Sequence, residues 1–330
     1  MLSIIIVNYY GREVLKACIE SVLRHTKDIP YEILVIDNAG DTVTQQMLKP
    51  FGDKVRWVDM GYNSGFGRAN NKAFSLMAGD VALLLNPDCI TFDNAIAECY
   101  KTFIRSEYVA CGIQLQNEDG SFQISGNYAM KGGLNYLLPL PYLGQALKSI
   151  AAMAGVRKSH VDRLEKEVAV DWINGAFLMV KKSAIEQTGG FDEDFFLYAE
   201  EAEWCSRLRK LGKLCIYGDY KITHLIGALS TEAFKGEDNS YYALYDRKGF
   251  QIILSNMVRI RKEFGAGWFL FLLMIYTLDI PVYLIAGLPH SVFTVKNQLK
   301  HFSGFSGNVL KVWRYFFKII GNKPYFYKVL

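Results

Sequence analysis

Short apolar runs alternate with helix-like patterns along roughly the first third of the chain. The apolar runs are rich in Val, Ile and Leu, which favours strands, and the stretches between them place apolar residues three and four positions apart, which favours helices. The predicted strands span residues 3–8, 31–36, 55–59 and 81–85, and the predicted helices span 12–25, 44–51, 68–78 and 94–106. Strands and helices that alternate at this spacing predict a parallel sheet with crossover helices.

Beyond residue 109 the alternation becomes less regular. Further strands are predicted at 109–116, 121–126, 169–180 and 213–217, and further helices at 182–187 and 199–211. Residues 127–167 mix glycine and proline with apolar residues, and we expect a mobile loop or lid there. The whole pattern predicts an α/β domain over residues 1–235, with a sheet flanked by helices.

The most informative stretch is Val81–Asp88. Its five apolar residues predict a strand that is buried on both faces, and Pro87 ends that strand because proline has no N–H for the ladder. Asp88 then follows the carboxyl end of a buried strand, which is where ligands bind in open α/β sheets. A carboxylate there is costly to keep ionised without a cation, so we expect Asp88 to bind a divalent metal that carries an anionic substrate. The alternative is a turn in which Asp88 caps the next helix.

Two other polar positions follow predicted strands, Asn8 and Asp37, and parallel strands bring such ends to one edge of the sheet. Asp37 suits a contact with the base or ribose of a nucleotide, or else it starts a turn. The loop Gly61–Arg68 opens a helix, where glycine allows close backbone approach and the helix N-terminus and Arg68 favour phosphate. The first strand leads into Val7–Gly11, which lacks a GxGxxG fingerprint, and this counts against a nicotinamide enzyme.

Three acids, Glu200, Glu201 and Glu203, lie at the start of a predicted helix, where the helix dipole alone would favour them. Glu200 and Glu201 point in different directions, so at most one faces the site, and Glu203 can pair with Arg207. A carboxylate that faces the metal would be a general base for an acceptor hydroxyl. His224 is either a structural histidine or the second metal ligand, and oxygen with imidazole ligands fits Mn²⁺ or Mg²⁺ better than structural zinc.

The net charge, the spacing of the cysteines and the N-terminal apolar run argue against several classes of protein. The net charge of +4 is too small to indicate nucleic-acid binding. The six cysteines form no CxxC pair, which argues against a zinc site and a secreted disulfide framework and suits a cytoplasmic location. The apolar run at residues 2–7 has no basic segment before it, so we interpret it as a first strand and not as a signal peptide.

The composition changes after about residue 235. Trp268–Gly287 is long enough to cross a bilayer, but Asp279 near its middle would cost about 2.5 kcal/mol or more there. A kinked in-plane or re-entrant segment, or a helix pair packed on protein, fits as well. Residues 291–330 carry seven Lys or Arg, no acid and many aromatic residues, which suits an anionic membrane surface. We therefore predict that residues 236–330 form a helical, membrane-associated region; an ordinary packed tail is the alternative, and no RNA-binding signature is present.

An ordered set of short motifs resembles family 2 glycosyltransferases of the rhamnosyltransferase-like branch. The motifs are Ser3–Tyr9, Val35–Asn38, Asn63–Phe66, Asn70–Asn71, Leu85–Asp88, Gly175–Leu178, Gly189–Glu193 and Phe196–Tyr198. The resemblance covers about residues 1–230 and implies a GT-A fold, which has a Rossmann-like mixed sheet flanked by helices. It also implies a nucleotide-sugar donor, a divalent metal (Mn²⁺ or Mg²⁺) and inversion at the anomeric carbon.

Residue by residue, the resemblance makes Glu201, beside Glu200, the catalytic base. Where Glu201 stands the family usually has an aspartate, and one extra methylene moves the carboxylate by about a bond length. Asp88 matches the last acid of an Asp-x-Asp-type motif, with Asn86 in the place of the first, and His224 matches a late metal-binding histidine. The donor-binding residues that the resemblance implies are Asn8, Asp37, Asn63, Gly65, Arg68, Asn86, Asp88 and Gly175.

The function that follows is transfer of a sugar, including a deoxysugar such as rhamnose, from a UDP-, dTDP- or GDP-linked donor. The expected acceptor is a hydroxyl of a lipid-linked or oligosaccharide glycan in surface polysaccharide (O-antigen-type) biosynthesis. We expect the enzyme at the cytoplasmic face of the cell membrane, peripheral or integral, with no nucleic-acid partner. The alternatives are a sugar-nucleotide nucleotidyltransferase, whose basic Gly-rich signature near the first strand is missing, and a non-catalytic carbohydrate- or membrane-binding protein on the same fold.

Overall fold

The structure is a computed structural model that describes residues 1–154, 166–225, 243–295 and 297–329. The chain divides into two compact units. The first unit comprises Met1–Tyr128, His160–Phe196 and Glu200–Ala233, and the second comprises Ala129–Ser159, Leu197–Ala199 and Phe234–Leu330. The domain boundary that we predicted at residue 235 stays a prediction.

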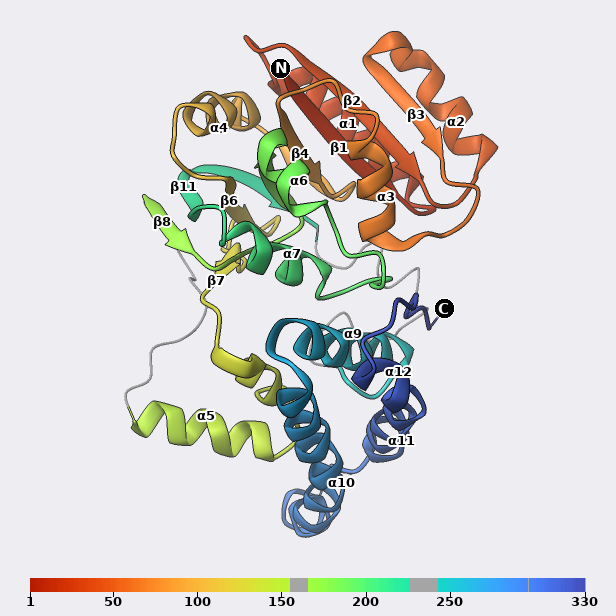
Figure 1. The fold of residues 1–330 in the computed structure, drawn as a ribbon, viewed down its shortest axis with the longest axis vertical. Coiled ribbons are helices and arrows are strands. Elements are labelled where there is room, and N and C mark those ends of the chain that lie inside the picture. The colour runs from red at the N-terminus through yellow and green to blue at the C-terminus, as the bar shows by residue number, and fades with distance from the viewer. Residues whose placement is uncertain (155–165, 226–242, 296, 330) are drawn as a thin grey trace. The chain divides into compact units, whose positions relative to one another are not determined.

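The first unit is built on a nine-stranded mixed sheet in the order β3-β2-β1-β4-β10-β6-β11-β5, with β8 paired to β11 (Figure 1). Neighbours among β1 to β4 are parallel, and β10 runs antiparallel to β4 and β6. A separate two-stranded sheet pairs β7 with β9. The strands are β1 Leu2–Asn8, β2 Tyr31–Asp37, β3 Val55–Asp59, β4 Val81–Leu85, β5 Cys89–Thr91, β6 Ala110–Gln116, β7 Gly126–Asn127, β8 Glu167–Val170, β9 Trp172–Ile173, β10 Phe177–Lys181 and β11 Leu214–His224.

Helices cover both faces of this sheet. Ile4 and Ile6 of β1 pack into a core with α1 and α4, whereas Ile5 packs into a second core with α3, α6 and α7. Because both faces of the sheet are buried, the sequences of the central strands are continuous apolar runs and do not alternate between apolar and polar residues. The helices of this unit are α1 Arg12–His25, α2 Thr42–Leu48, the 3₁₀ segment η1 Lys49–Lys54, α3 Gly65–Phe74, α4 Ala95–Ile104, α6 Lys182–Thr188 and α7 Glu200–Leu208.

The predicted α/β class with a mixed sheet is confirmed, and several boundaries are corrected. The helix predicted from residue 68 begins at Gly65, and residues 214–224 form one strand with an irregularity between Tyr217 and Lys221. The segment 121–126 makes only a bridge from Phe122 to Gln116 before β7. Of the expected lid, residues 155–165 lie outside the described residues, and the rest contains helical segments and the start of β8.

The second unit is helical. Its longest helix, α10, packs against α9 and α11, and a buried network joins it to the 3₁₀ segment η2. In this network the hydroxyl of Tyr276 donates to the carbonyl of Tyr136 at 2.7 Å, and Arg259 bonds to the hydroxyl of Tyr136 and to Glu263. The helices are η2 Lys131–Leu137, α5 Leu143–Met153, α9 Arg247–Phe264, α10 Ala266–Thr294, α11 Phe302–Val312, η3 Trp313–Tyr315 and α12 Phe316–Ile320.

Helix α10 is long and apolar enough to cross a membrane, with a mean hydropathy of 2.1 over its most apolar window. Length and composition alone are weak evidence for a span, because the core helix of a soluble protein passes the same test. The distribution of its buried and exposed side chains is therefore the more useful observation.

Candidate active site

Asp88 lies in the turn between β4 and β5, where the sequence placed it. The backbone N–H of Asn86 donates to the carbonyl of Ala176 at 3.0 Å, and the N–H of Cys89 donates to the carbonyl of Asn86 at 3.1 Å, so the chain turns tightly after the buried strand. The Asp88 side chain is buried, and its Oδ1 has no hydrogen-bond partner among the described residues. A buried carboxylate oxygen without a donor is costly unless a cation lies beside it.

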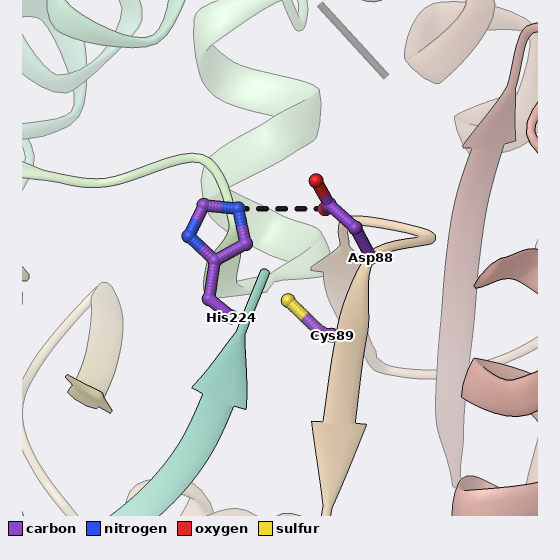
Figure 2. Close-up of side chains that lie close together, drawn as sticks. All are labelled: Asp88, Cys89 and His224. Carbon is purple, nitrogen blue, oxygen red and sulfur yellow. Dashed lines mark ion pairs between the residues drawn. The ribbon is translucent and has the colours of Figure 1, made fainter. Parts of the chain in front are cut away.

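Strand pairing brings His224 to Asp88. β5 and β11 run antiparallel, and their register sets His224 opposite Cys89, the residue after Asp88. Figure 2 shows His224 at the end of β11 with its ring turned toward Asp88; Nε2 lies 3.4 Å from Oδ1 of Asp88. On the other side of the ring, Nδ1 lies 2.9 Å from Oε1 of Gln123, a residue that the sequence analysis did not single out.

These residues fit a divalent cation. Possible ligand atoms of Asp88, Cys89 and His224 lie within 4.8 Å of one another (Figure 2). Burial, and then the charge of Asp88, raises the pKa of the Cys89 thiol well above its ordinary value, and its Sγ donates to the carbonyl of Ala176 at 3.5 Å. Cys89 is thus a protonated thiol and a poor ligand, which leaves one carboxylate and one imidazole. This donor set, with positions open to phosphate oxygens and water, suits Mn²⁺ or Mg²⁺.

Glu201 lies close to the same turn through Gly175. A Cβ built on Gly175 would lie 3.8 Å from Cγ of Glu201 and 3.7 Å from the ring of Phe66. The next residue, Ala176, supplies the carbonyl that receives hydrogen bonds from Asn86 and Cys89. The loop at 174–176 therefore lies beside both the turn that carries Asp88 and the side chain of Glu201.

The two neighbouring glutamates have different environments. Glu200 is buried and its Oε2 has no partner in the described part of the chain. Burial, and then the charge of Glu201, raises the pKa of Glu200 well above its ordinary value, which favours the protonated form of Glu200. The chain enters α7 through Tyr198 and Ala199, both in the left-handed region with φ of 69° and 67°. Such strained backbone occurs most often at functional sites.

Glu203 does not belong to the site. It accepts two hydrogen bonds from Arg207, at 2.8 Å from Nε and 2.6 Å from Nη2, and Arg207 also donates to the carbonyl of Thr188 at 2.6 Å. The predicted pairing of Glu203 with Arg207 is therefore confirmed. Of the three acids at the start of α7, this one stabilises the helix and its packing.

The glycine-rich loop approaches the rest of the unit very closely at Gly65. Gly65 has φ of +77°, and a Cβ there would overlap the carbonyl oxygen of Phe196. The N–H of Phe66 donates to that carbonyl at 3.1 Å, and Asn63 Oδ1 accepts from the N–H of Gly65 at 3.2 Å. Arg68 donates from Nε to the carbonyl of Glu193 at 2.9 Å. The loop is thus fixed against the segment that leads into α7.

Asn8 and Asp37 meet at the carboxyl ends of β1 and β2, as predicted for parallel strands. Asn8 Nδ2 donates to Oδ1 of Asp37 at 3.2 Å, and the backbone N–H groups of Ala39 and Asp41 donate to the same carboxylate at 3.2 and 3.3 Å. Both side chains are fully buried. In this structure Asp37 holds the loop after β2, and its contact with a nucleotide stays a prediction.

Comparison with known proteins gives a family match. Residues 3–164 match the model described as glycosyl transferase family 2. The N-acetylglucosaminyl-diphospho-decaprenol L-rhamnosyltransferase of Mycobacterium tuberculosis is 28% identical over 203 residues, 57% of this chain and 64% of that protein. Rhamnosyltransferase WbbL of Escherichia coli is 25% identical over 221 residues, 64% of this chain and 78% of that protein. The chain thus matches somewhat less than two thirds of the mycobacterial relative's length.

Solved structures share the fold. GalNAc-T7 with UDP, GalNAc and Mn²⁺ has a TM-score of 0.55 at 14% identity, covering 97% of this chain and 56% of that one. The mannosyltransferase PcManGT of Pyrobaculum calidifontis, in complex with GDP-Man and Mn²⁺, has a TM-score of 0.54 at 10% identity, covering 95% of this chain and 86% of that one. At these identities the likeness shows the fold alone, and the predicted GT-A fold is confirmed.

Proposed function

The chain belongs to glycosyl transferase family 2, and we propose that it is an inverting, metal-dependent glycosyltransferase. Its donor would be a nucleotide-sugar, and its acceptor the hydroxyl of a glycan. One observation carries this proposal: a buried carboxylate oxygen of Asp88, without a hydrogen-bond donor among the described residues, faces the His224 imidazole at 3.4 Å. Through the loop at 174–176, the same turn lies near Glu201.

Asp88 and His224 would hold the cation, which when bound supplies positive charge that stabilises the diphosphate leaving group. Glu201 would accept the proton of the acceptor hydroxyl. The acceptor oxygen then forms a bond to the anomeric carbon while the bond from that carbon to the diphosphate oxygen breaks on the opposite face, which inverts the configuration. Burial favours the protonated form of Glu200, so Glu201 is the better proton acceptor of the two.

The loop at Asn63–Gly65 and the start of α3 would receive the donor. The dipole at a helix N-terminus favours phosphate, and Arg68, which lies in the first turn of this helix, adds a cation. The sugar that best agrees with the relatives' names is a deoxyhexose such as L-rhamnose, with a hexose next. The nucleotide is UDP, dTDP or GDP, since the structural neighbours were solved with UDP and GDP-mannose.

Donor hydrolysis and sugar transfer, assayed with a panel of nucleotide-sugars with and without Mn²⁺, test this function. We expect turnover that requires Mn²⁺, loss of it in Asp88→Ala, and a fall of about 100- to 10,000-fold in Glu201→Gln, the range for removal of a general base. Glu200→Gln should cost far less, because it replaces a neutral acid by a neutral amide of the same shape. Full activity in Asp88→Ala or Glu201→Gln would reject the role assigned to that residue.

We further propose that the second unit attaches the enzyme to the membrane through one face of α10. The residues of α10 that are buried inside the unit lie along one face of the helix: Phe269, Leu272, Leu273, Tyr276, Asp279, Tyr283 and Gly287. On the opposite face, exposed apolar side chains repeat every three or four residues: Phe271, Met274, Leu278, Val282, Ile285, Leu288 and Val292. Leu284 and Phe293 of the same helix are exposed as well. A continuous exposed apolar stripe of this length is typical of an interaction site.

Neighbouring residues indicate that the partner is an anionic lipid surface. The indole N–H of Trp313 donates to Thr277 of α10 at 3.1 Å, which sets η3 beside the helix. Around Trp313, exposed Lys311, Arg314 and Lys318 accompany Phe317, whose side chain is 85% exposed. Cations next to exposed aromatic residues suit the headgroup region of such a membrane.

Helix α10 would lie in the plane of the membrane and not cross it. Asp279, the charged residue that makes a span costly, points into the protein and is fully buried. Helix α9 packs on α10 and carries six charged residues. If α10 crossed the membrane, these charged residues would lie close to the hydrocarbon, and each one that entered it would cost about 2.5 kcal/mol or more. Such an attachment at the cytoplasmic face would bring the enzyme to a lipid-linked acceptor in surface-polysaccharide biosynthesis.

Flotation with anionic phospholipid vesicles tests this attachment. We expect binding that weakens in high salt and is released by alkaline carbonate, and a loss of about tenfold or more in Leu278→Lys with Ile285→Lys. Ile104→Lys, at a comparably exposed position of α4 in the first unit, is the matched control and should bind like the unchanged protein. Resistance to carbonate would indicate a span, and unchanged binding of the double variant would reject the docking face.

A further inference from the structure

Gln123 contacts His224 on the side of the ring away from Asp88. Its Oε1 lies 2.9 Å from Nδ1 of His224. Its amide nitrogen, Nε2, lies 2.6 Å from the carbonyl of His224 and 2.7 Å from Oδ1 of Asn117, with the carbonyl of Gln116 at 3.4 Å. All three of these partners are oxygen acceptors, so the NH₂ group must point toward them. The orientation of the amide is therefore determined, and its oxygen faces the imidazole.

This orientation has a consequence for the imidazole. An oxygen acceptor 2.9 Å from Nδ1 requires a proton on Nδ1. In the neutral ring, Nε2 then carries a lone pair, and that lone pair faces Oδ1 of Asp88 at 3.4 Å. A nitrogen lone pair and a carboxylate oxygen that face each other both require a positive charge, as two ligands of one cation do.

We propose that Gln123 is a positioning residue of the metal site: it fixes the tautomer and the ring orientation of His224, so that Nε2 is available as a ligand. This inference rests on the proposed function, because it concerns the same site. The backbone of Gln123 is held independently of its side chain. Its N–H donates to the carbonyl of Leu115 at 2.9 Å, and its carbonyl accepts from Gln114 Nε2 at 3.0 Å. A change of the Gln123 side chain should leave this backbone in place.

The tautomer is measured directly by ¹⁵N NMR of histidine-labelled full-length protein without metal, at about pH 8.5, where an ordinary imidazole is neutral. The His224→Asn variant identifies the His224 signals. In the unchanged protein we expect a proton on Nδ1. In Gln123→Met, which keeps the length and removes the acceptor, the proton should move to Nε2. Gln116→Met is the matched control: its amide lies in the same segment and, within the described residues, bonds from Nε2 to Oγ1 of Thr223 at 3.5 Å and not to Gln123 or His224.

Calorimetric titration with Mn²⁺ alone gives the second measurement. We expect Gln123→Met to weaken Mn²⁺ binding about 10- to 100-fold, the usual effect of removing such an outer partner, and Gln116→Met to bind Mn²⁺ like the unchanged protein. A proton on Nε2 in the unchanged protein would overturn the proposal, as would weaker Mn²⁺ binding in Gln123→Met without a change of tautomer. Absence of Mn²⁺ binding in the unchanged protein would refute the proposed metal site itself, while the NMR result would still decide the role of Gln123.

Discussion

Replacing Gly65 by alanine should destabilise the first unit far more than the same change at Gly61, four residues earlier in the same loop. Both glycines have positive φ, +77° at Gly65 and +71° at Gly61. A Cβ on Gly61 would meet no described atom within 4 Å. A Cβ on Gly65 would overlap the carbonyl oxygen of Phe196 and lie 2.9 Å from its carbonyl carbon. The pair therefore separates the cost of the backbone conformation from the cost of the close approach.

The expected magnitudes follow from these contacts. Left-handed backbone costs an alanine about 1–2 kcal/mol, and the smaller entropy of the unfolded chain returns about 0.4–1 kcal/mol, so Gly61→Ala should cost roughly 1 kcal/mol. At Gly65 the added methyl group has no room beside Phe196, and this overpacking should cost about 1–3 kcal/mol more. It also displaces the bond from Phe66 N–H to Phe196 O, at about 0.5–1.5 kcal/mol. The loss of stability in Gly65→Ala should therefore exceed that in Gly61→Ala by about 1.5–4.5 kcal/mol.

Urea unfolding of the full-length protein, followed by fluorescence, measures this difference for the two variants side by side. Donor binding adds a functional measure, because a shift of the Gly65 loop moves the start of α3, where the phosphates are proposed to bind. Gly61→Ala should keep donor affinity close to that of the unchanged protein. Equal stability of the two variants would show that the loop does not approach Phe196 as the structure has it.

Further predictions concern groups elsewhere in the molecule. Arg207→Met leaves the buried Glu203 without its partner and should cost about 3 kcal/mol, whereas Arg209→Met breaks a more exposed pair with Asp171 and should cost under about 1 kcal/mol; thermal unfolding compares them. Burial raises the pKa of Asp279 to about 7. The folded state therefore keeps a proton that the unfolded state releases, and stability should fall as the pH rises from about 4 to about 7. In Asp279→Asn this fall should be smaller, because the contribution of Asp279 is removed, and an unchanged pH dependence in urea unfolding would show that Asp279 is not buried.

Features that depend on residues close together in the sequence could be predicted from the sequence. The apolar run at Val81–Leu85 and the proline after it were enough to predict both a buried strand and the position of Asp88 at its end. The sequence pattern predicts the start of α3 at residue 68, which is too late, because Asn63, Ser64 and Gly65 are typical of a loop. What allows the helix to begin there is a contact distant in sequence, in which Ser64 Oγ donates to Asn38 Oδ1 at 2.7 Å.

The parts of the site that depend on strand register could not be predicted in this way. His224 was recognised by its resemblance to a family motif, but its approach to Asp88 follows from the pairing of β5 with β11. Gln123 carries no sequence signal, because a glutamine after a turn is ordinary, and only the network around its amide reveals its orientation. The 3₁₀ segment η2 packs against α9 and α10, far along the chain, through contacts that no local pattern encodes.

We propose that Asp88 and His224 hold a divalent cation beside Glu201, the proposed catalytic base. Electron paramagnetic resonance of Mn²⁺, titrated into the full-length protein with a nucleoside diphosphate present, measures this binding. We predict one bound Mn²⁺ per chain in the unchanged protein, loss of this binding in Asp88→Ala and marked weakening in His224→Asn, with Glu201→Gln binding Mn²⁺ normally. Binding of Mn²⁺ to Asp88→Ala with unchanged affinity would contradict the claim.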